Sequence, residues 1–76
     1  MSTLLRYSLQ PDSALFVETP VGIGWQTIVD GATGAPMDLR EEMIAAGGRD
    51  GAQVVWDRLF KASRYLRDAT IQGVDA

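Results

Sequence analysis

The chain has 76 residues with 7 basic and 10 acidic side chains, a formal net charge of -3, and neither cysteine nor histidine. Disulfides are therefore excluded, and so are the usual zinc and iron–sulfur sites and every catalytic system that needs a cysteine or histidine. A chain this short forms at most one domain of marginal stability. We expect a single domain over residues 1–76, stabilised by efficient packing or by homo-oligomerisation.

The first two predicted strands span residues 4–10 and 14–19. Leu5, Tyr7 and Leu9 alternate with polar residues, which is the period of a half-buried strand. Pro11 and Asp12 suit the central positions of a turn, and the apolar, partly β-branched segment 14–19 reads as the return strand.

A third strand is predicted at residues 21–29, after a turn signal at residues 19–22. Its odd-numbered residues share one face, whereas Gly22 and Gly24 leave the other face bare, which suggests a bulge or a close approach of another segment. We expect Trp25 to lie in the core and to face Trp56. The residues of the shared face are Val21, Ile23, Trp25, Thr27 and Val29.

Two helices are predicted after the strands, at about residues 39–46 and 51–72. Asp38 is a candidate N-cap with Glu41 three residues later, and Gly47 can end the first helix. Asp50 and Gln53 are a second capping pair before a long amphipathic segment. The apolar face of this segment, which we expect to cover the sheet, includes Trp56, Leu59, Phe60 and Leu66.

The order of elements is thus β-β-β-α-α, and the predicted fold class is α+β. It consists of a small three-stranded antiparallel meander, followed by a short helix and a long amphipathic helix packed on the sheet.

The opening segment, residues 4–19, resembles the first hairpin of the small bacterial trypsin-co-occurring domains, which accompany protease and NTPase modules. The resemblance covers 16 of the 76 residues and consists of the hairpin pattern. It implies a hairpin at this place and assigns no function and no site residue.

Neither of the glycine-rich segments has a complete nucleotide-binding motif. The segment Gly22-Ile23-Gly24 lacks the third glycine of a dinucleotide fingerprint, and residues 31–34 lack the lysine of a P-loop. Turns and bulges explain these glycines better, so no cofactor is predicted.

An acidic cluster lies where the first helix is expected to start. Asp38 and Glu42 are spaced to share a hard cation, with Glu41 beside them. Acidic residues also stabilise a first helical turn, and this is the favoured interpretation, so no metal is predicted.

The predicted function is that of a non-enzymatic protein–protein interaction module, with no catalytic residue assigned. Residues 51–76 hold 4 basic and 3 acidic groups, whereas residues 1–50 hold 3 and 7, so the last helix is locally basic. Val54 and Tyr65 fall on its polar face with Arg58 and Lys61 between them, the pattern of a contact stripe. A bacterial or phage accessory protein, an inhibitor or a small subunit would fit this size and acidity.

Two alternatives stay open. A nucleic-acid-associated regulator could use the basic helix, although the net negative charge makes nucleic acid an unlikely partner. Less favoured is a subunit of an enzyme completed by another chain. No apolar run reaches the roughly 20 residues needed to span a bilayer, and no signal-peptide pattern is present, so we expect a cytoplasmic protein without a membrane partner.

Overall fold

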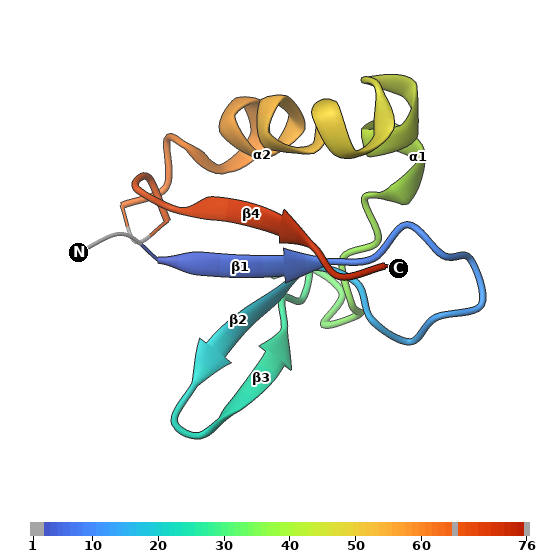
Figure 1. Ribbon diagram of the computed structural model, residues 1–76. Coiled ribbons are helices and arrows are strands. Elements are labelled where there is room, and N and C mark those ends of the chain that lie inside the picture. Colours follow the sequence, from blue (N-terminus) through green and yellow to red (C-terminus); the bar gives the residue numbers. More distant parts are fainter. Residues whose placement is uncertain (1–2, 65, 76) are drawn as a thin grey trace.

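The computed structural model describes residues 3–64 and 66–75 and has an α+β architecture (Figure 1). Two helices and a short 3₁₀ turn lie over one end of a four-stranded sheet in this part of the chain. The elements in chain order are β1 (Leu4–Tyr7), β2 (Glu18–Val21), β3 (Gly24–Thr27), α1 (Arg40–Ala45), the 3₁₀ turn η1 (Gly48–Asp50), α2 (Ala52–Phe60) and β4 (Thr70–Gly73).

The sheet is mixed, with the strand order β3-β2-β1-β4. β1 is antiparallel to β2, with Arg6 opposite Glu18, and β2 is antiparallel to β3. β4 runs parallel to β1, with Leu4 opposite Thr70 at the start of the pair. The last strand of the chain therefore lies beside the first, and the two inner strands are β1 and β2.

The predicted strand number and order are wrong, because residues 51–72 do not form one helix. α2 ends at Phe60, and Thr70–Gly73 form β4. The predicted helical face still reaches the core, since Ala69 is buried and Leu66 packs against the core. From Ala69 onward, however, buried and exposed residues alternate with the period of a strand, and pairing with β1 decides the structure.

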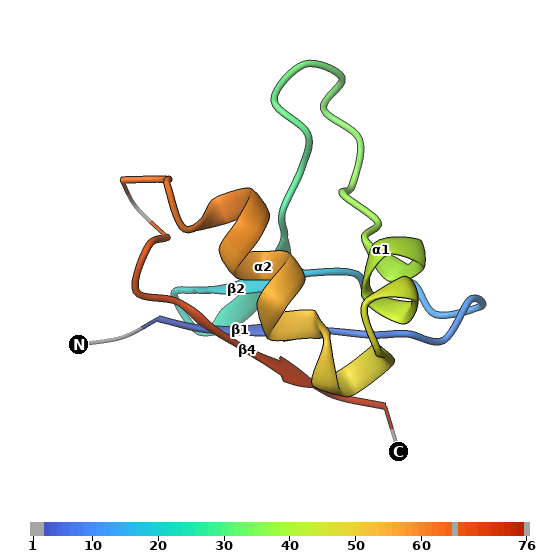
Figure 2. The same cartoon turned by 90° about the horizontal axis from the view of Figure 1, so that it is seen from above.

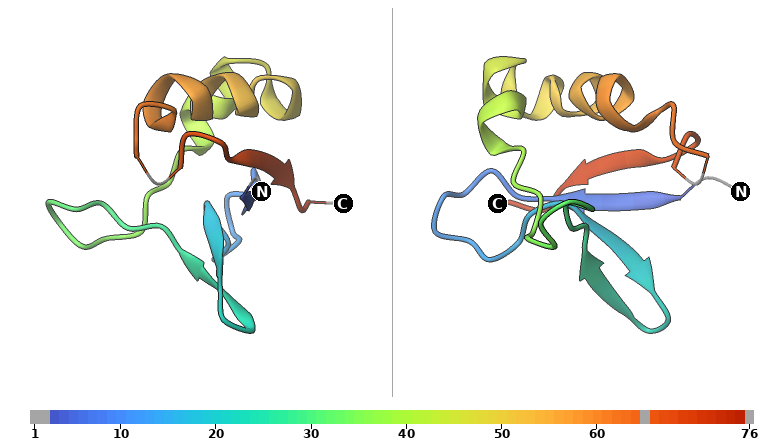
Figure 3. Two further views of the ribbon diagram at one scale, coloured as in Figure 1. Left: turned by 90° about the vertical axis from the view of Figure 1, so that its left-hand side faces the viewer. Right: turned by 180° about the vertical axis from the view of Figure 1, so that it is seen from behind.

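The first predicted hairpin is replaced by a long connection. β1 ends at Tyr7 rather than at residue 10, and β2 begins at Glu18 rather than at residue 14. The turn at Pro11 and Asp12 is present, since the amide of Ser13 donates to the carbonyl of Gln10 at 3.1 Å. It lies within residues 8–17, which pass beneath α1 as a loop (Figure 3).

The second hairpin is present, but its turn lies two residues later than predicted. Pro20 is part of β2, and β1 pairs with β2 only at Arg6 and Glu18, so no partner strand needs the N–H that proline lacks. Gly22 and Ile23 form the two-residue loop, with Val21 paired to Gly24. Gly22 has φ of 59°, the conformation that the first central position of a type II′ turn requires. β3 is correspondingly shorter than the predicted strand 21–29.

The core lies between the helices and the β1–β4 side of the sheet (Figure 1). Val55 and Trp56 of α2 are fully buried, and the Trp56 ring stacks on Phe60 with 4.2 Å between ring centroids. The nine buried apolar residues are Leu5, Tyr7, Val17, Leu39, Met43, Ala52, Val55, Trp56 and Ala69. Leu59, predicted to face the sheet, is 47% exposed in the last turn of α2, so this prediction is wrong.

The first helix is close to its prediction, α1 being Arg40–Ala45 with Gly47 in the left-handed conformation after it. The Asp38 carboxylate accepts the Arg40 amide at 3.1 Å. Neither expected capping pair forms. Leu39, and not Asp38, is the N-cap of α1, and Gly51, and not Asp50, precedes α2. Gly51 is buried against the end of α1, and a Cβ placed on it would lie 2.0 Å from the Ala46 carbonyl oxygen.

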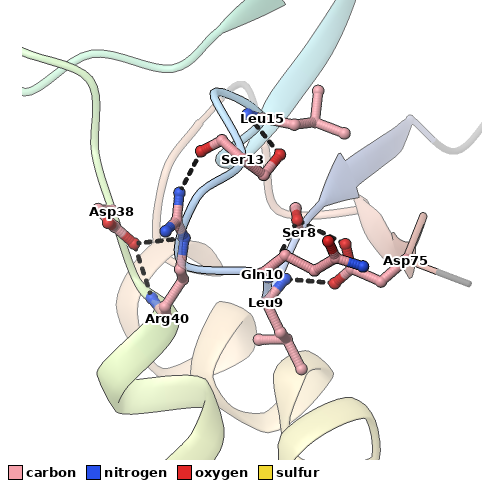
Figure 4. Close-up of polar contacts among 8 residues, drawn as sticks. All are labelled: Ser8, Leu9, Gln10, Ser13, Leu15, Asp38, Arg40 and Asp75. Atoms are coloured by element: carbon pink, nitrogen blue, oxygen red, sulfur yellow. Dashed lines mark hydrogen bonds and ion pairs between the residues drawn. The ribbon is translucent and has the colours of Figure 1, made fainter.

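β4 is held from two sides by side chains. The side-chain Oε1 of Gln53 accepts a hydrogen bond from the Ile71 backbone amide at 2.9 Å, and its side-chain Nε2 donates to the Asp57 carboxylate at 3.0 Å. Beyond β4, the Asp75 carboxylate accepts hydrogen bonds from the Ser8 hydroxyl at 2.5 Å and from the Leu9 amide (Figure 4). These bonds, the one from Ser8 above all, hold the pKa of Asp75 below its ordinary value.

Gly51→Ala should destabilise the protein, because its methyl group would collide with backbone rather than with a movable side chain. We expect the free energy of unfolding to fall by about 2 kcal/mol or more, as in other overpacked cores. Gly24→Ala is the matched control, since nothing lies within 4 Å of its added Cβ. Urea denaturation of both variants measures the difference, and equal stability would contradict the tight α1–α2 junction.

The hydrogen bonds that Asp75 accepts from Ser8 and Leu9 predict that the stability of the protein depends on pH. A carboxyl whose pKa is lowered by folding stabilises the native state above its unfolded pKa of about 3.9, and this contribution is lost as the pH falls through the folded value. Asp75→Ala should therefore be less stable than the wild type at pH 7, and the difference should shrink in acid. Denaturation midpoints at pH 7, 5 and 3 measure it, with the exposed Asp68→Ala as control. If the stability difference between Asp75→Ala and the wild type does not change with pH, the charged Asp75 carboxylate does not stabilise the fold.

Candidate protein-interaction surfaces

The outer face of α2 carries three of the four residues of the predicted contact stripe. Val54 is 61% exposed, and Arg58 and Lys61, four and seven residues later, are also exposed. This spacing places the three side chains on one side of the helix axis, away from the buried Val55 and Trp56. Tyr65, the fourth residue, lies outside the described residues, so the stripe extends over Val54, Arg58 and Lys61.

The charge of this face is smaller than the sequence suggests. The Lys61 ammonium lies 3.6 Å from the Asp57 carboxylate, in the favoured helical spacing. Arg64 and Arg67 follow the end of α2 and do not extend its face. The outer face of α2 therefore carries one exposed aliphatic side chain, one arginine and one lysine that is paired with Asp57, and it is not a long basic stripe.

The hairpin of β2 and β3 exposes apolar residues that the sequence placed together in the core. They do not share one face, because the turn lies at Gly22 and Ile23, and Val21, which pairs with Gly24, lies on the face opposite Trp25. Ile23 is completely exposed, Val21 is 51% exposed and Trp25 is 37% exposed. The hairpin points away from the helices, which lie over β1 and β4 (Figures 1 and 3). The prediction that Trp25 faces Trp56 across the core is therefore wrong, because no helix in the described part of the chain extends over this hairpin.

Trp25 instead lies on the sheet face opposite the helices, where a cation covers its ring. The Arg6 guanidinium carbon is 3.8 Å from the ring centroid, and the same guanidinium donates to the Glu18 carboxylate at 3.0 Å. Arg6 and Glu18 are opposite one another in β1 and β2, so the sheet register brings the three side chains together. A cation on the indole face contributes about 0.5–1 kcal/mol at a partly exposed site.

The acidic cluster does not gather into a cation site. The carboxylate of Asp38 accepts from the Arg40 amide and lies 3.4 Å from the Arg40 Nε, while Glu41 and Glu42 are exposed in the first turn of α1. Across residues 3–64 and 66–75, no three acidic side chains lie close enough to hold a metal ion. Glu41 and Glu42 thus lie in the first turn of α1, where acidic side chains oppose the helix dipole, whereas Asp38 lies before the N-cap Leu39.

An open cavity of about 540 Å³ lies between α1 and the loop of residues 8–17. Its main cation is engaged by the chain itself, because Arg40 donates to the Ser13 carbonyl at 2.7 Å and stacks over the Phe16 ring at 4.7 Å. The cavity is lined by Leu9, Pro11, Asp38, Arg40, Glu41 and Ile44.

Both glycine-rich segments form turns. Gly22 is the first loop residue of the β2–β3 hairpin. In the segment of residues 28–37, which projects from the body of the molecule (Figure 2), the Asp30 carboxylate accepts the Ala32 amide at 2.7 Å and Gly34 has φ of 74°. The geometry of both segments is that of a turn and not of a loop leading into a helix around a phosphate.

None of the helices in the described residues is both long and apolar enough to cross a bilayer. Comparison of the chain with protein-family models, with curated proteins and with solved structures found no match. The tight hairpin that the resemblance of residues 4–19 to the trypsin-co-occurring domains implies is not formed, since a ten-residue connection separates β1 from β2. Evidence for function comes from the surfaces of the molecule itself.

Proposed function

We propose that this chain is a non-enzymatic protein-interaction module that binds another protein through the outer face of α2. One observation carries the proposal: Val54, a large aliphatic residue in the middle of a well-packed helix, is 61% exposed beside Arg58. The neighbouring Val55 and Trp56 are fully buried, so the helix is held firmly by its inner face while Val54 points away from the core. A rigid helix with an exposed apolar anchor is a recurring element of protein recognition.

The remaining surface also exposes apolar residues. Nine large apolar residues are exposed in the described part of the chain, as many as form its buried apolar core. They are spread over several elements, and single exposed apolar residues are ordinary, so the proposal rests on Val54 and not on their number. The exposed residues are Leu4, Val21, Ile23, Trp25, Val29, Ile44, Val54, Leu59 and Val74.

The chemistry of the α2 face limits its partner. An aliphatic anchor next to Arg58 fits a partner surface with a shallow apolar pocket bordered by a carboxylate. The role would be that of a small accessory protein, an inhibitor or a subunit of a larger assembly. The sequence has neither cysteine nor histidine, so neither residue can serve as a nucleophile or a general base.

The nucleic-acid alternative is less well supported than the sequence pattern suggested. A phosphate backbone needs several cations on one surface. α2 itself offers only Arg58 and Lys61, the latter beside Asp57. The two hypotheses differ in one measurable property, since phosphate binding falls steeply with salt whereas an apolar anchor is much less sensitive.

Val54→Ser should weaken partner binding about tenfold, because about 1.5 kcal/mol of apolar burial would be lost at the interface. The experiment is affinity purification from the native source with the wild type and the variant, followed by titration of the purified partner. Ile44→Ser is the matched control, since Ile44 is 59% exposed on α1, away from α2. If Val54→Ser binds as tightly as Ile44→Ser, the α2 face is not the interface. Salt-dependent binding of DNA or RNA by the wild type would favour the alternative.

A further inference from the structure

The two edges of the sheet differ in how their backbone groups are satisfied. On the β4 edge, the Gln53 side chain accepts the outward amide of Ile71 at 2.9 Å and donates to the carbonyl of Ala69 at 3.4 Å. The amide of Gln53 thereby acts as a short substitute for a neighbouring strand. Arg49 also donates to the backbone carbonyl of Asp75, so the end of this edge is engaged as well. An edge covered in this way cannot add another strand readily.

The opposite edge, that of β3, is open. Three hydrogen bonds show which residues face inward: the Ile28 amide donates to Val17, the Met37 amide to Ile28, and the Asp30 amide to Ala35. Backbone groups alternate along an antiparallel strand, so Trp25, Thr27 and Val29 direct their N–H and C=O groups outward. β3 is the last strand of the sheet that the described residues form, and no further strand pairs with it.

The usual protections of an edge strand are missing from β3. Natural edges carry charges, prolines or bulges that prevent pairing with another chain. Residues 24–27 are Gly, Trp, Gln and Thr, without a charge or a proline, and all four pair in regular register with β2. Gly24 has open space around it, so no side chain stands in the way there.

We propose that residues 24–30, which comprise β3 and the three residues after it, pair antiparallel with residues 24–30 of a second copy of this chain, around a twofold axis at Thr27. This register brings outward-facing residues opposite one another, with Thr27 facing its own copy and Trp25 facing Val29 of the second copy. Trp25 is 37% exposed and Val29 is 48% exposed, and an aromatic side chain beside a β-branched one is a favoured cross-strand pair. The two four-stranded sheets would form one continuous sheet.

The edge itself selects a second copy as the occupant. An antiparallel edge with outward groups at residues 25, 27 and 29 is complementary to itself, since each pair of facing residues can exchange two hydrogen bonds. No charge lies at these positions, so no like charges face one another across the paired residues. The contact is short, which predicts a weak dimer whose population depends on concentration. This proposal does not depend on the α2 face.

Cysteine cross-linking tests the pairing directly, because the wild type has no cysteine. In Thr27→Cys, the two thiols would lie across the twofold axis, where facing Cα atoms are about 5.5 Å apart, within the range of a disulfide. Thr70→Cys is the matched control, an exposed threonine in the strand of the covered edge. We expect mild oxidation to convert Thr27→Cys to a covalent dimer at least tenfold faster than Thr70→Cys. Equal rates would overturn the proposal.

Sedimentation equilibrium over a concentration series gives the second measurement. The wild type should show a monomer–dimer equilibrium, and Thr27→Lys should raise its dissociation constant at least tenfold, because two like charges would meet at the axis. Circular dichroism verifies that the variant folds, and if it does not, the cross-linking comparison decides. A wild type that stays monomeric at millimolar concentration would overturn the proposal. A dimer that dissociates in Val54→Ser but persists in Thr27→Lys would also overturn the proposal.

Discussion

The parallel pairing of β4 with β1 is the constraint on which the rest of the structure depends. It brings residues 70–73 back beside residues 4–7, and the chain can reach that position only if α2 stops at Phe60. The side chains that secure the pair come from distant places, Gln53 from α2 and Ser8 from the end of β1. Because such a pairing closes a large loop, its cost in chain entropy must be met by the burial of Leu5, Tyr7 and Ala69 around it.

This pairing also determines what the molecule exposes. The helices lie over β1 and β4, so they cannot extend over β2 and β3 (Figure 1). The hairpin is left with its apolar residues in solvent, and Trp25 finds Arg6 rather than a helix as its neighbour. The outer face of α2 and the edge of β3 are separate surfaces, and the fold leaves both accessible while it covers the edge of β4.

The sequence predicted the local features better than the topology. The turn at Pro11 and Asp12, the short helix near residues 39–46 and the burial of Trp56 all follow from local patterns, and the structure contains them. β4 was not predicted, because Leu66 and Ala69 fit the helical repeat of α2 and the partner strand of β4 lies more than 60 residues away. Periodicity also shows which residues share a face of a strand without showing which face is covered, and this explains the error at Trp25.

The candidate surfaces were also predictable only in part. Helical spacing placed Val54, Arg58 and Lys61 on the outer face of α2, where the structure has them exposed. The open edge of β3 could not be inferred, because residues 24–27 carry none of the charges or prolines that usually mark an edge strand. Gln53 illustrates the point: its spacing from Asp50 indicated a helix cap, yet its amide group binds β4 instead.

The fold closes one edge of its sheet and leaves the other open. Amide hydrogen exchange, measured residue by residue in dilute solution where a weak dimer dissociates, distinguishes the two edges. The amide of Ile71, held by Gln53, should exchange slowly, whereas the outward amides of Trp25 and Thr27 should exchange rapidly. Comparable protection of these three amides in the monomer would contradict this difference between the edges.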